Sequence, residues 1–309
     1  MESSDKIKIV TILGPTSSGK TELAVRLAEK CGGEIVNADS MQVYRGMDIG
    51  TAKPSKELCN RVPHHLIDIV DPDEEFSASD FRREAERAIQ DISSRGNTVF
   101  VVGGTGLYIK ALLKGLVDSP RGGGLLRRSL QDEARLLGGE LLLQRLWTVD
   151  PVTAAGLHQN DQVRIIRALE VYLQTGCPLS QFRSEHGFGN DYYNCLKIGI
   201  SIERGELYRR VEERVESMMT SGFLEEVESL KSRGFSADIK PFRAIGYKEL
   251  LAHLSGQMSL FESVELIKRD TRRYAKRQVT WFKKDSQINW VEYPVKFDTI
   301  YNNVIEFFA

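Results

Sequence analysis

The sequence predicts an α/β protein, in which a parallel sheet flanked by helices is interrupted by an all-helical insertion. Short β-branched runs alternate with amphipathic segments up to residue 118 and resume after residue 195. Such alternation is typical of a parallel sheet with helical crossovers. Residues 119–195 are instead rich in leucine at helical spacing. We therefore expect an α/β core from 1–118 and 196–309, and a helical insertion domain from 119–195.

The totals are those of an ordinary globular protein. A chain of 309 residues suits two packed units or one domain with an insertion. Hydrophobic residues make up 41% and charged residues 28%, which excludes a disordered or membrane-embedded chain. The formal net charge of −1 argues neither for nor against a nucleic-acid partner.

Cysteine spacing and the N-terminus indicate the compartment. Cys31, Cys59, Cys177 and Cys195 form no C-x-x-C pair, so neither a zinc site nor a disulfide framework is predicted. The first residues are polar, and the apolar run after them is too short for a signal peptide or a membrane span. We expect a cytoplasmic protein with reduced thiols and no membrane association. The sequence shows no heptad seam that would require an oligomer. We therefore expect a monomer without an obligate protein partner.

A phosphate-binding loop follows the first predicted strand, residues 7–13. Its residues match the pattern G-x-x-x-x-G-K-[ST]: Gly14, Pro15, Thr16, Ser17, Ser18, Gly19, Lys20 and Thr21. Apolar residues then recur at helical spacing. In this setting backbone N–H groups and the helix N-terminus attract phosphate, Lys20 neutralises it, and the Thr21 hydroxyl can hold Mg²⁺. A nucleoside triphosphate is the default ligand, but a diphosphate ester would fit as well.

Further elements of the first half alternate as the fold requires. We predict strands at 34–38, 66–70 and 98–102, and an amphipathic helix at 79–94.

Three of these strand ends should form one site. In parallel α/β sheets, ligands bind beyond the carboxyl ends of the strands. That edge would bring together the phosphate loop, Asp39 after the second strand and Thr105 after the strand at 98–102.

The second half begins with a glycine-rich linker at 119–124 and helical segments to about residue 182. A strand at 196–202 then returns to the sheet. Two long helices follow, at 206–231 with a bend at Gly222, and at 260–284.

The last helix is strongly basic. It carries eight bases against the single acid Asp270: Lys268, Arg269, Arg272, Arg273, Lys276, Arg277, Lys283 and Lys284. Aromatic residues lie between them. This composition favours a surface for a nucleic-acid backbone, although a solvated basic helix without a ligand remains an alternative.

These motifs together resemble the bacterial tRNA dimethylallyltransferases, or tRNA isopentenyltransferases, nearly from end to end. The most specific segment is 37–54, which begins Asn37-Ala38-Asp39-Ser40-Met41-Gln42. The phosphate loop and further segments also match the family: 64–68, 103–108, 164–171, 244–249 and 271–278.

The resemblance implies a P-loop NTPase-like core, Mg²⁺ as cofactor and tRNA as substrate. The implied reaction transfers the dimethylallyl group of dimethylallyl diphosphate to N6 of the adenine 3′ of the anticodon, position 37. The tRNAs would be those that read codons starting with U. The helical insertion would grip the anticodon stem-loop.

Residue roles follow from the chemistry and from this resemblance. The exocyclic adenine amine is a weak nucleophile, and a carboxylate that takes its proton would activate it. Asp39 is our candidate for this base, although an Asp at this position could also only cap the next turn. Thr105 and Arg214 match the family residues that hold the diphosphate. On spacing alone, Arg214 could equally pair with a glutamate of its own helix.

The predicted tRNA contacts lie in both domains. Asp39, Ser40, Met41, Gln42 and Thr105 would read the extruded adenine, by analogy with the family. On the insertion, the contacts would come from Arg127, Val163, Arg164, Ile165, Ile166 and Arg167. The family usually has Gln at the place of Val163, so an amide contact to RNA is lost there.

Other functions are compatible with parts of the sequence. A small-molecule or nucleoside kinase would explain the phosphate loop, but not the basic helix. An RNA-binding ATPase would explain the helix, but not Asp39 at the sheet edge. His64 and His65 have no third ligand at useful spacing, so we expect structural hydrogen bonds and not a metal site.

Overall fold

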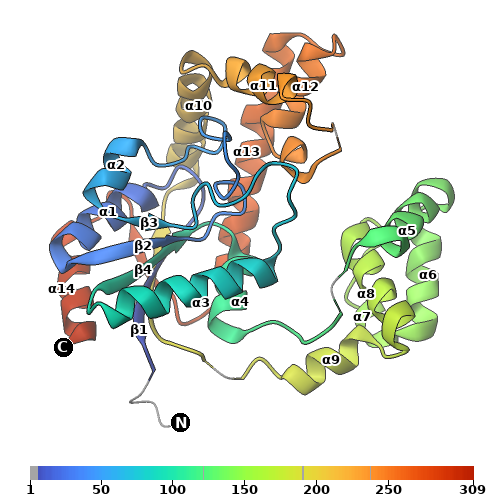
Figure 1. The fold of residues 1–309 in the computed structure, drawn as a ribbon, viewed down its shortest axis with the longest axis horizontal. Helices are drawn as coiled ribbons and strands as arrows, with labels where there is room; N and C mark the ends of the chain where they lie inside the picture. Colours follow the sequence, from blue (N-terminus) through green and yellow to red (C-terminus); the bar gives the residue numbers. More distant parts are fainter. Residues whose placement is uncertain (1–5, 121, 190, 237) are drawn as a thin grey trace. The chain divides into compact units, whose positions relative to one another are not determined.

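The computed structural model describes residues 6–120, 122–189, 191–236 and 238–309 (Figure 1). The chain divides into two compact units. The larger contains the described residues up to 113 and from 191 onward, and the smaller those from 114 to 189. The predicted boundaries were residues 119 and 195. The sheet resumes slightly earlier than predicted, because β5 begins at Asn194.

A six-stranded sheet runs through the larger unit, in the order β3-β2-β4-β1-β5-β6 among the described residues. All five pairings are parallel. The strands are β1 (Lys8–Leu13), β2 (Gly33–Asn37), β3 (His64–His65), β4 (Thr98–Gly103), β5 (Asn194–Ser201) and β6 (Asn289–Glu292). The predicted α/β fold with a parallel sheet is confirmed. The sequence analysis did not predict β6.

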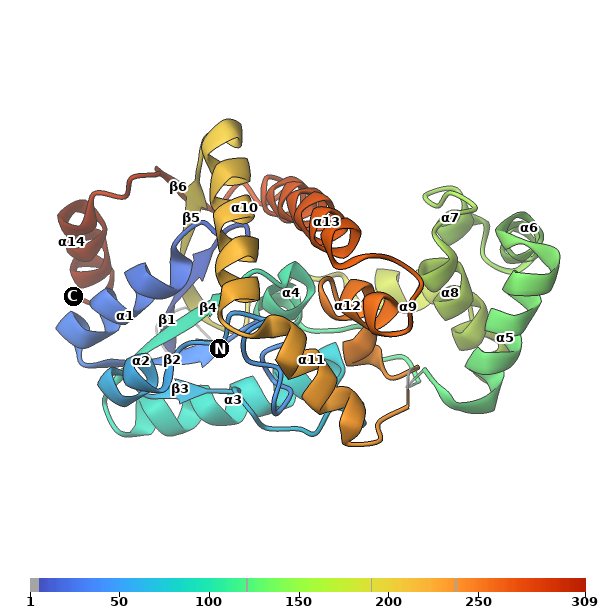
Figure 2. The ribbon, with the colours of Figure 1, turned by 90° about the horizontal axis from the view of Figure 1, so that it is seen from above.

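Helices cover both faces of this sheet, and β1 shows why. Ile9 and Leu13 face a core that includes α3 (Ala78–Ser94) and α4 (Gly106–Lys114). Val10 and Ile12 point to the opposite core, with α1 (Lys20–Cys31) and α14 (Phe297–Phe308). Figure 2 shows α14 beside α1. A strand buried on both faces is mostly apolar, which explains this β-branched run, in which the buried Thr11 is a polar exception.

The predicted strand at 66–70 is wrong. The strand is His64–His65, which pairs with Ile35 and Val36 of β2. Beyond it, Leu66 and Asp68 have φ angles of 64° and 55°. This left-handed backbone ends the strand despite its apolar sequence.

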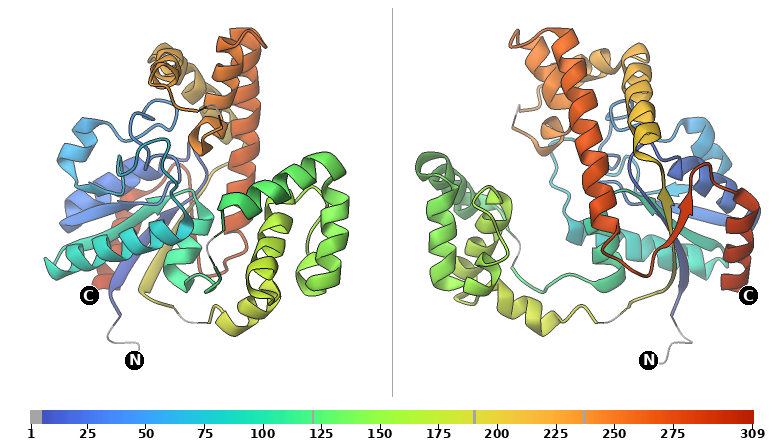
Figure 3. Two further views of the ribbon diagram at one scale, coloured as in Figure 1. Left: turned by 45° about the vertical axis from the view of Figure 1, so that its right-hand side comes forward. Right: turned by 180° about the vertical axis from the view of Figure 1, so that it is seen from behind.

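The predicted helix at 206–231 is two helices. α10 (Arg204–Thr220) ends before Gly222, whose φ of 94° turns the chain into α11 (Phe223–Ser232). α12 (Tyr247–Leu254) precedes the long α13 (Leu260–Phe282), which begins with a capping box of Ser259 and Glu262. Figure 3 shows α13 running alongside α10. Two short elements complete this unit, α2 (Lys56–Arg61) and the 3-10 turn η2 (Lys240–Arg243).

The smaller unit is helical throughout. It contains α5 (Gly124–Leu137), α6 (Gly139–Val149), α7 (Pro151–Ala154), α8 (Gln162–Thr175) and α9 (Leu179–His186). Its core has its own leucine-rich cluster, centred on residues such as Leu130, Leu146 and Leu169. The fully buried Glu170 is held by Arg127 at 3.0 Å and Arg167 at 3.2 Å. A buried carboxylate requires such partners, because its desolvation is costly.

None of the helices in the described ranges is both long and apolar enough to cross a bilayer.

Candidate active site

The phosphate loop turns tightly from β1 into α1. The Lys20 ammonium donates a hydrogen bond to the carbonyl of Pro15 at 2.6 Å, across the loop. The hydroxyl oxygens of Ser17 and Ser18 are buried and find no hydrogen-bond partner in the described chain. Buried polar groups are normally paired. The loop is therefore built for a polar ligand that would satisfy these groups.

Three charged side chains meet beside this loop. Burial and, to a smaller extent, the nearby Arg214 guanidinium lower the pKa of Lys20 to about 7, although Asp39 opposes both effects. Burial likewise lowers the pKa of Arg214, again opposed by Asp39. Two cations close to a single carboxylate leave an excess of positive charge. An anionic ligand would neutralise that excess and stabilise both charged forms.

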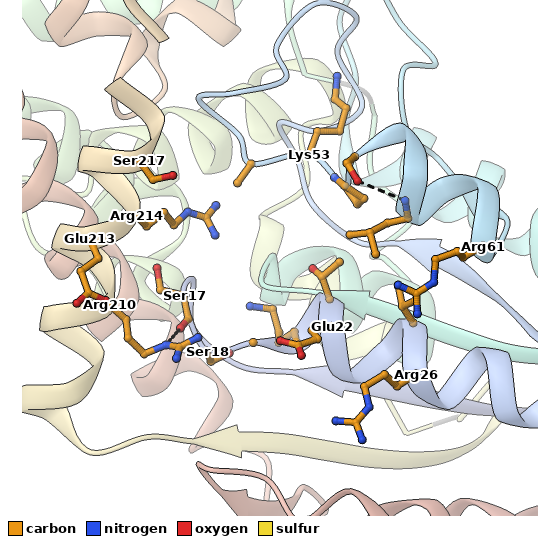
Figure 4. Close-up of a pocket in the computed structure, with 18 residues that line it drawn as sticks. Ser17, Ser18, Glu22, Arg26, Lys53, Arg61, Arg210, Glu213, Arg214 and Ser217 are labelled. Carbon is orange, nitrogen blue, oxygen red and sulfur yellow. Dashed lines mark hydrogen bonds between the residues drawn. The ribbon is translucent and has the colours of Figure 1, made fainter. Parts of the chain in front are cut away.

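Arg214 faces the cavity and is not part of an ion pair on its own helix. Its acidic neighbours have other partners: Glu212 binds Arg272, Glu213 binds Arg209, and Glu216 binds Lys268. Arg214 itself donates to the carbonyl of Thr51 at 3.4 Å. In Figure 4 its guanidinium extends from α10 into the space opposite α1.

Asp39 follows β2 and both caps a turn and lines the site. Its Oδ1 accepts the backbone N–H groups of Met41 at 2.8 Å and Gln42 at 3.3 Å. Its Oδ2 accepts no hydrogen bond from the described residues. The turn thus fixes the carboxyl group and leaves one oxygen available for a proton.

Thr105 lies at the end of β4, close to Asp39 in the fold. Its hydroxyl oxygen accepts the Ser40 N–H at 3.1 Å, and its own N–H donates to the Ala38 carbonyl at 3.3 Å. The two strand ends approach closely, since a Cβ at Gly103 would lie 2.2 Å from the Ala38 oxygen. Only glycine fits there.

Three cavities adjoin in this region, and Arg214 lines all of them. The largest, about 760 Å³, lies over the phosphate loop and is lined by bases of α1, α2 and α10 (Figure 4). A small cavity of about 80 Å³ lies between Lys20, Thr21 and Asp39. The third, about 310 Å³, lies on the other side of Asp39. Its apolar walls include Met41, Met218 and Ile267.

The chain from the end of the Asp39 turn onward is matched by the model of a known family. The family model described as IPP transferase matches residues 42–285, most of the chain. The chain belongs to the IPP transferase family.

Curated relatives of this family member are similar over their full length. A tRNA dimethylallyltransferase 2 of Geotalea uraniireducens is 67% identical over 309 residues, covering 100% of both chains. The tRNA dimethylallyltransferase of Geobacter sulfurreducens is 60% identical, covering 100% of this chain and 99% of the relative.

Solved structures agree with the fold. The tRNA isopentenylpyrophosphate transferase of Bacillus halodurans has a TM-score of 0.73 at 40% identity, with 98% of this chain and 97% of that chain covered. A eukaryotic dimethylallyltransferase acting on tRNA has a TM-score of 0.78 at 30% identity. There the coverage is 93% of this chain and 74% of that chain. The P-loop NTPase-like fold class is thereby confirmed, and the kinase alternative is not favoured.

The structure brings together most of the residues predicted for the catalytic site of this IPP transferase. Asp39 and Arg214 line the same two cavities, and Lys20 and Thr21 face the first and the second. Thr105 does not line any of the three, although it holds the backbone of Ser40. Ser40 and Met41 line the third cavity, and Gln42 lines the second.

The predicted tRNA residues of the helical unit fall into two groups. Val163 is 79% exposed and Arg164 is also exposed. Ile165 and Ile166 are buried in the leucine-rich core of the unit. Their side chains hold the helix in place, so only the exposed Val163 and Arg164 of these four residues are available to a ligand. Arg127 and Arg167 are half-buried on Glu170.

The basic helix α13 is less positive than its sequence suggests. Glu212 and Glu216 of α10 pair with Arg272 and Lys268, and Asp270 pairs with Arg269 and Arg273. The bases that remain exposed outside these pairs lie toward its C-terminal end: Lys276, Arg277, Lys283 and Lys284.

The two adjacent histidines take part in structural hydrogen bonds. His64 Nδ1 lies 2.7 Å from the Val62 carbonyl, and His65 Nε2 lies 2.7 Å from a carboxylate oxygen of Glu34. This agrees with the structural role expected for the pair.

The sequence analysis missed several residues of the site. Gln278 of α13 accepts the Thr16 N–H at 2.8 Å and donates to the Gly104 carbonyl at 3.0 Å. Arg210 of α10 donates to the Ser17 carbonyl at 2.8 Å. Gln278 lies in the segment 271–278 that resembles the family, so its position was a signal. Nothing in the local pattern distinguishes Arg210 from other helical arginines.

Proposed function

We propose that this chain is a tRNA dimethylallyltransferase. It transfers the dimethylallyl group of dimethylallyl diphosphate to N6 of the adenine at position 37, next to the anticodon, in tRNAs that read codons starting with U. The observation that carries this proposal is the position of Asp39, which lines both the small cavity beside Lys20 and Thr21 and a partly apolar cavity. Family membership and the names of the relatives support it.

The loop side of the site suits a diphosphate leaving group. Lys20, Arg214 and the backbone N–H groups of the loop would stabilise the charge that develops as the carbon–oxygen bond breaks. The unpaired Ser17 and Ser18 hydroxyls support a ligand with many acceptor oxygens. We propose a diphosphate ester as this ligand, so that nucleotide binding by the loop is not required for the reaction.

Asp39 would act as the general base. As N6 forms its bond to the allylic carbon, its proton would pass to the Asp39 carboxylate and the bond from carbon to diphosphate would break. Thr105 and Arg214 would hold the diphosphate, as in the family. The Asp39–Gln42 turn would bind the adenine edge, and the apolar walls beside it suit a flat base or a prenyl group.

Mg²⁺ fits this donor set. The Thr21 hydroxyl borders the first two cavities, and Asp39 lines the second of them. Magnesium in proteins is commonly held by one or two such groups together with substrate phosphates. Thr21 would hold the ion, which would supply positive charge to the leaving diphosphate.

We further propose that the helical unit and the C-terminal half of α13 bind the anticodon stem-loop. The exposed Val163 and Arg164 on α8, with Arg127 and Arg167 nearby, would contact it on the helical unit. We also propose a cytoplasmic monomer that needs no protein partner, since its four cysteines are free and its substrates are a tRNA and a small diphosphate.

The test is incorporation of radiolabelled dimethylallyl diphosphate into an anticodon stem-loop with Mg²⁺, comparing wild type with Asp39→Ala and Asp39→Asn. Asn retains an oxygen for the Met41 and Gln42 amides, so it should fold as wild type. We expect label in the RNA for wild type and at least about a hundredfold less for both variants. Full activity of Asp39→Asn would refute the role of Asp39 as a base and would leave only its role in capping the turn. ATP turnover without incorporation would favour the kinase class.

A further inference from the structure

A carboxylate outside the cavities holds the loop that forms one of their walls. Glu226, on α11, accepts the backbone N–H groups of Asp48 at 2.8 Å, Ile49 at 2.7 Å and Gly50 at 3.1 Å. It also accepts the hydroxyl of Tyr247 at 2.6 Å. Three successive N–H groups that point the same way form an anion-binding concavity. Here the protein fills that concavity with its own side chain.

The turn is also tightly packed against α11. A Cβ at Gly50 would lie 2.1 Å from the ring of Phe223, so only glycine allows this approach. Phe223 in turn contacts Tyr247 edge to face, with ring centroids 5.1 Å apart. The segments 48–50 and 244–249 both match the family motifs, yet neither supplies a group to the proposed chemistry.

The next residue connects this turn to the site. The carbonyl of Thr51 accepts the Gln42 amide at 3.0 Å and the Arg214 guanidinium at 3.4 Å. Thr51 is itself buried, and its hydroxyl donates to the Met47 carbonyl at 2.6 Å. The direction of the Thr51 carbonyl therefore depends on the turn that Glu226 fixes.

We propose that Glu226 is a positioning residue: it clamps the turn at 48–50 and, through the Thr51 carbonyl, sets the position of Arg214. Hydrogen bonds from N–H groups to a carboxylate are stronger than those to a neutral acceptor. A glutamine would offer one acceptor oxygen and direct an NH₂ group toward backbone donors. Only the role of Arg214 in this proposal rests on the proposed function.

The first measurement is the affinity for inorganic diphosphate, by titration calorimetry with Mg²⁺. We expect Glu226→Gln to weaken binding about tenfold, because Arg214 loses its fixed position. Glu225→Gln is the matched control, since Glu225 is adjacent, exposed and makes none of these contacts. It should bind within about twofold of wild type.

A double-mutant cycle separates positioning from a general loss of structure. In an Arg214→Gln background, Glu226→Gln should change diphosphate affinity by less than about twofold, because the group it positions is absent. An equal tenfold loss in both backgrounds, or no loss in either, would overturn the proposal. If Glu226→Gln fails to fold, Tyr247→Phe removes one hydrogen bond of the clamp and should act in the same direction.

Amide hydrogen exchange tests the clamp without any ligand. The amides of residues 48–50 should exchange at least about tenfold faster in Glu226→Gln than in wild type, and Glu225→Gln should match wild type. Unchanged exchange would refute the clamp. Absence of diphosphate binding in wild type would refute the proposed function instead, and exchange would still decide whether the clamp exists.

Discussion

Lys20 and Arg214 are two cations that the fold holds close to each other and to one carboxylate, Asp39. Desolvation disfavours the charged form of both, which is reflected in the lowered pKa of each group. In the free protein this arrangement costs folding free energy. A bound diphosphate would reverse that cost, since each cation then gains an anionic partner. The arrangement thus lowers the stability of the protein without ligand and raises its affinity for diphosphate.

This arrangement predicts that Lys20→Met stabilises the empty protein. The pKa of Lys20 is about 7 in the fold and about 10.5 in an unfolded chain, so the unfolded state binds more protons between these values. The penalty is full below pH 7 and fades as pH rises toward 10.5. We expect Lys20→Met to be more stable than wild type by about 2 kcal/mol at pH 6, less than full burial would imply, because water enters the cavity.

Urea unfolding at pH 6 and pH 9.5 checks this, with diphosphate affinity measured in parallel. The stability difference should shrink at the higher pH, and affinity should fall at least about tenfold. A variant less stable than wild type at pH 6 would contradict the prediction.

At the scale of elements, α13 joins the phosphate loop to the glycine-rich turn at 103–106, after β4. Gln278 is buried and uses both ends of its amide, accepting from Thr16 and donating to Gly104. Tyr274 lies one turn earlier, and burial and the Asp39 charge raise its pKa to about 12. The hydrogen bonds of the Tyr274 hydroxyl with Thr105 and Gln278 partly offset this rise. One helix therefore fixes the phosphate loop and the turn after β4 relative to each other.

We predict that Gln278→Ala destabilises the protein by about 2 kcal/mol, because the partly buried Thr16 N–H and the buried Gly104 carbonyl lose their partners. It should also raise the KM for dimethylallyl diphosphate, since the loop around Thr16 is no longer fixed. Phe261→Ala, an exposed position at the opposite end of the same helix, serves as the control. Chemical denaturation and initial-rate kinetics measure the two effects, and an unchanged KM would argue against a role in shaping the loop.

At the scale of the whole molecule, the cavities of the proposed site belong to one unit, and the second unit provides surface without such a cavity among those described above. The larger unit contains all three cavities, and the smaller unit has a core of its own and a buried ion cluster at Glu170. Positive charge available for RNA is found on both, at the exposed end of α13 and on α8. Much of the remaining basic character of α13 is neutralised by α10.

We therefore predict that tRNA affinity falls steeply with salt, and that the bases of α13 contribute unequally. Lys276→Ala and Lys283→Ala should each weaken binding and reduce the slope of log affinity against log salt by about 0.7 to 0.9. Lys268→Ala should leave the slope unchanged, because this lysine is paired with Glu216 and Glu265. Fluorescence anisotropy with a labelled stem-loop measures this. Equal effects at all three positions would contradict it.

The sequence by itself determined the fold class and the centre of the site. Runs such as Ile9–Leu13, apolar on both faces, require a sheet covered on both sides, and parallel strands place their carboxyl ends at one edge. The phosphate loop and Asp39 therefore had to meet. The conformations of these two loops depend on residues close together in the sequence, so sequence patterns predict them.

Tertiary structure alone decided the rest. The strand at His64–His65 ends because Leu66 adopts a left-handed backbone, which its apolar side chain does not reveal. Whether Arg214 paired on its own helix or faced the cavity depended on Arg272, Arg209 and Lys268, which occupy its acidic neighbours. The roles of Gln278 and Glu226 rest on contacts 262 and 176 to 178 residues apart in the chain. Such contacts exist only after the chain has folded, since no local pattern fixes which distant amide a side chain will meet.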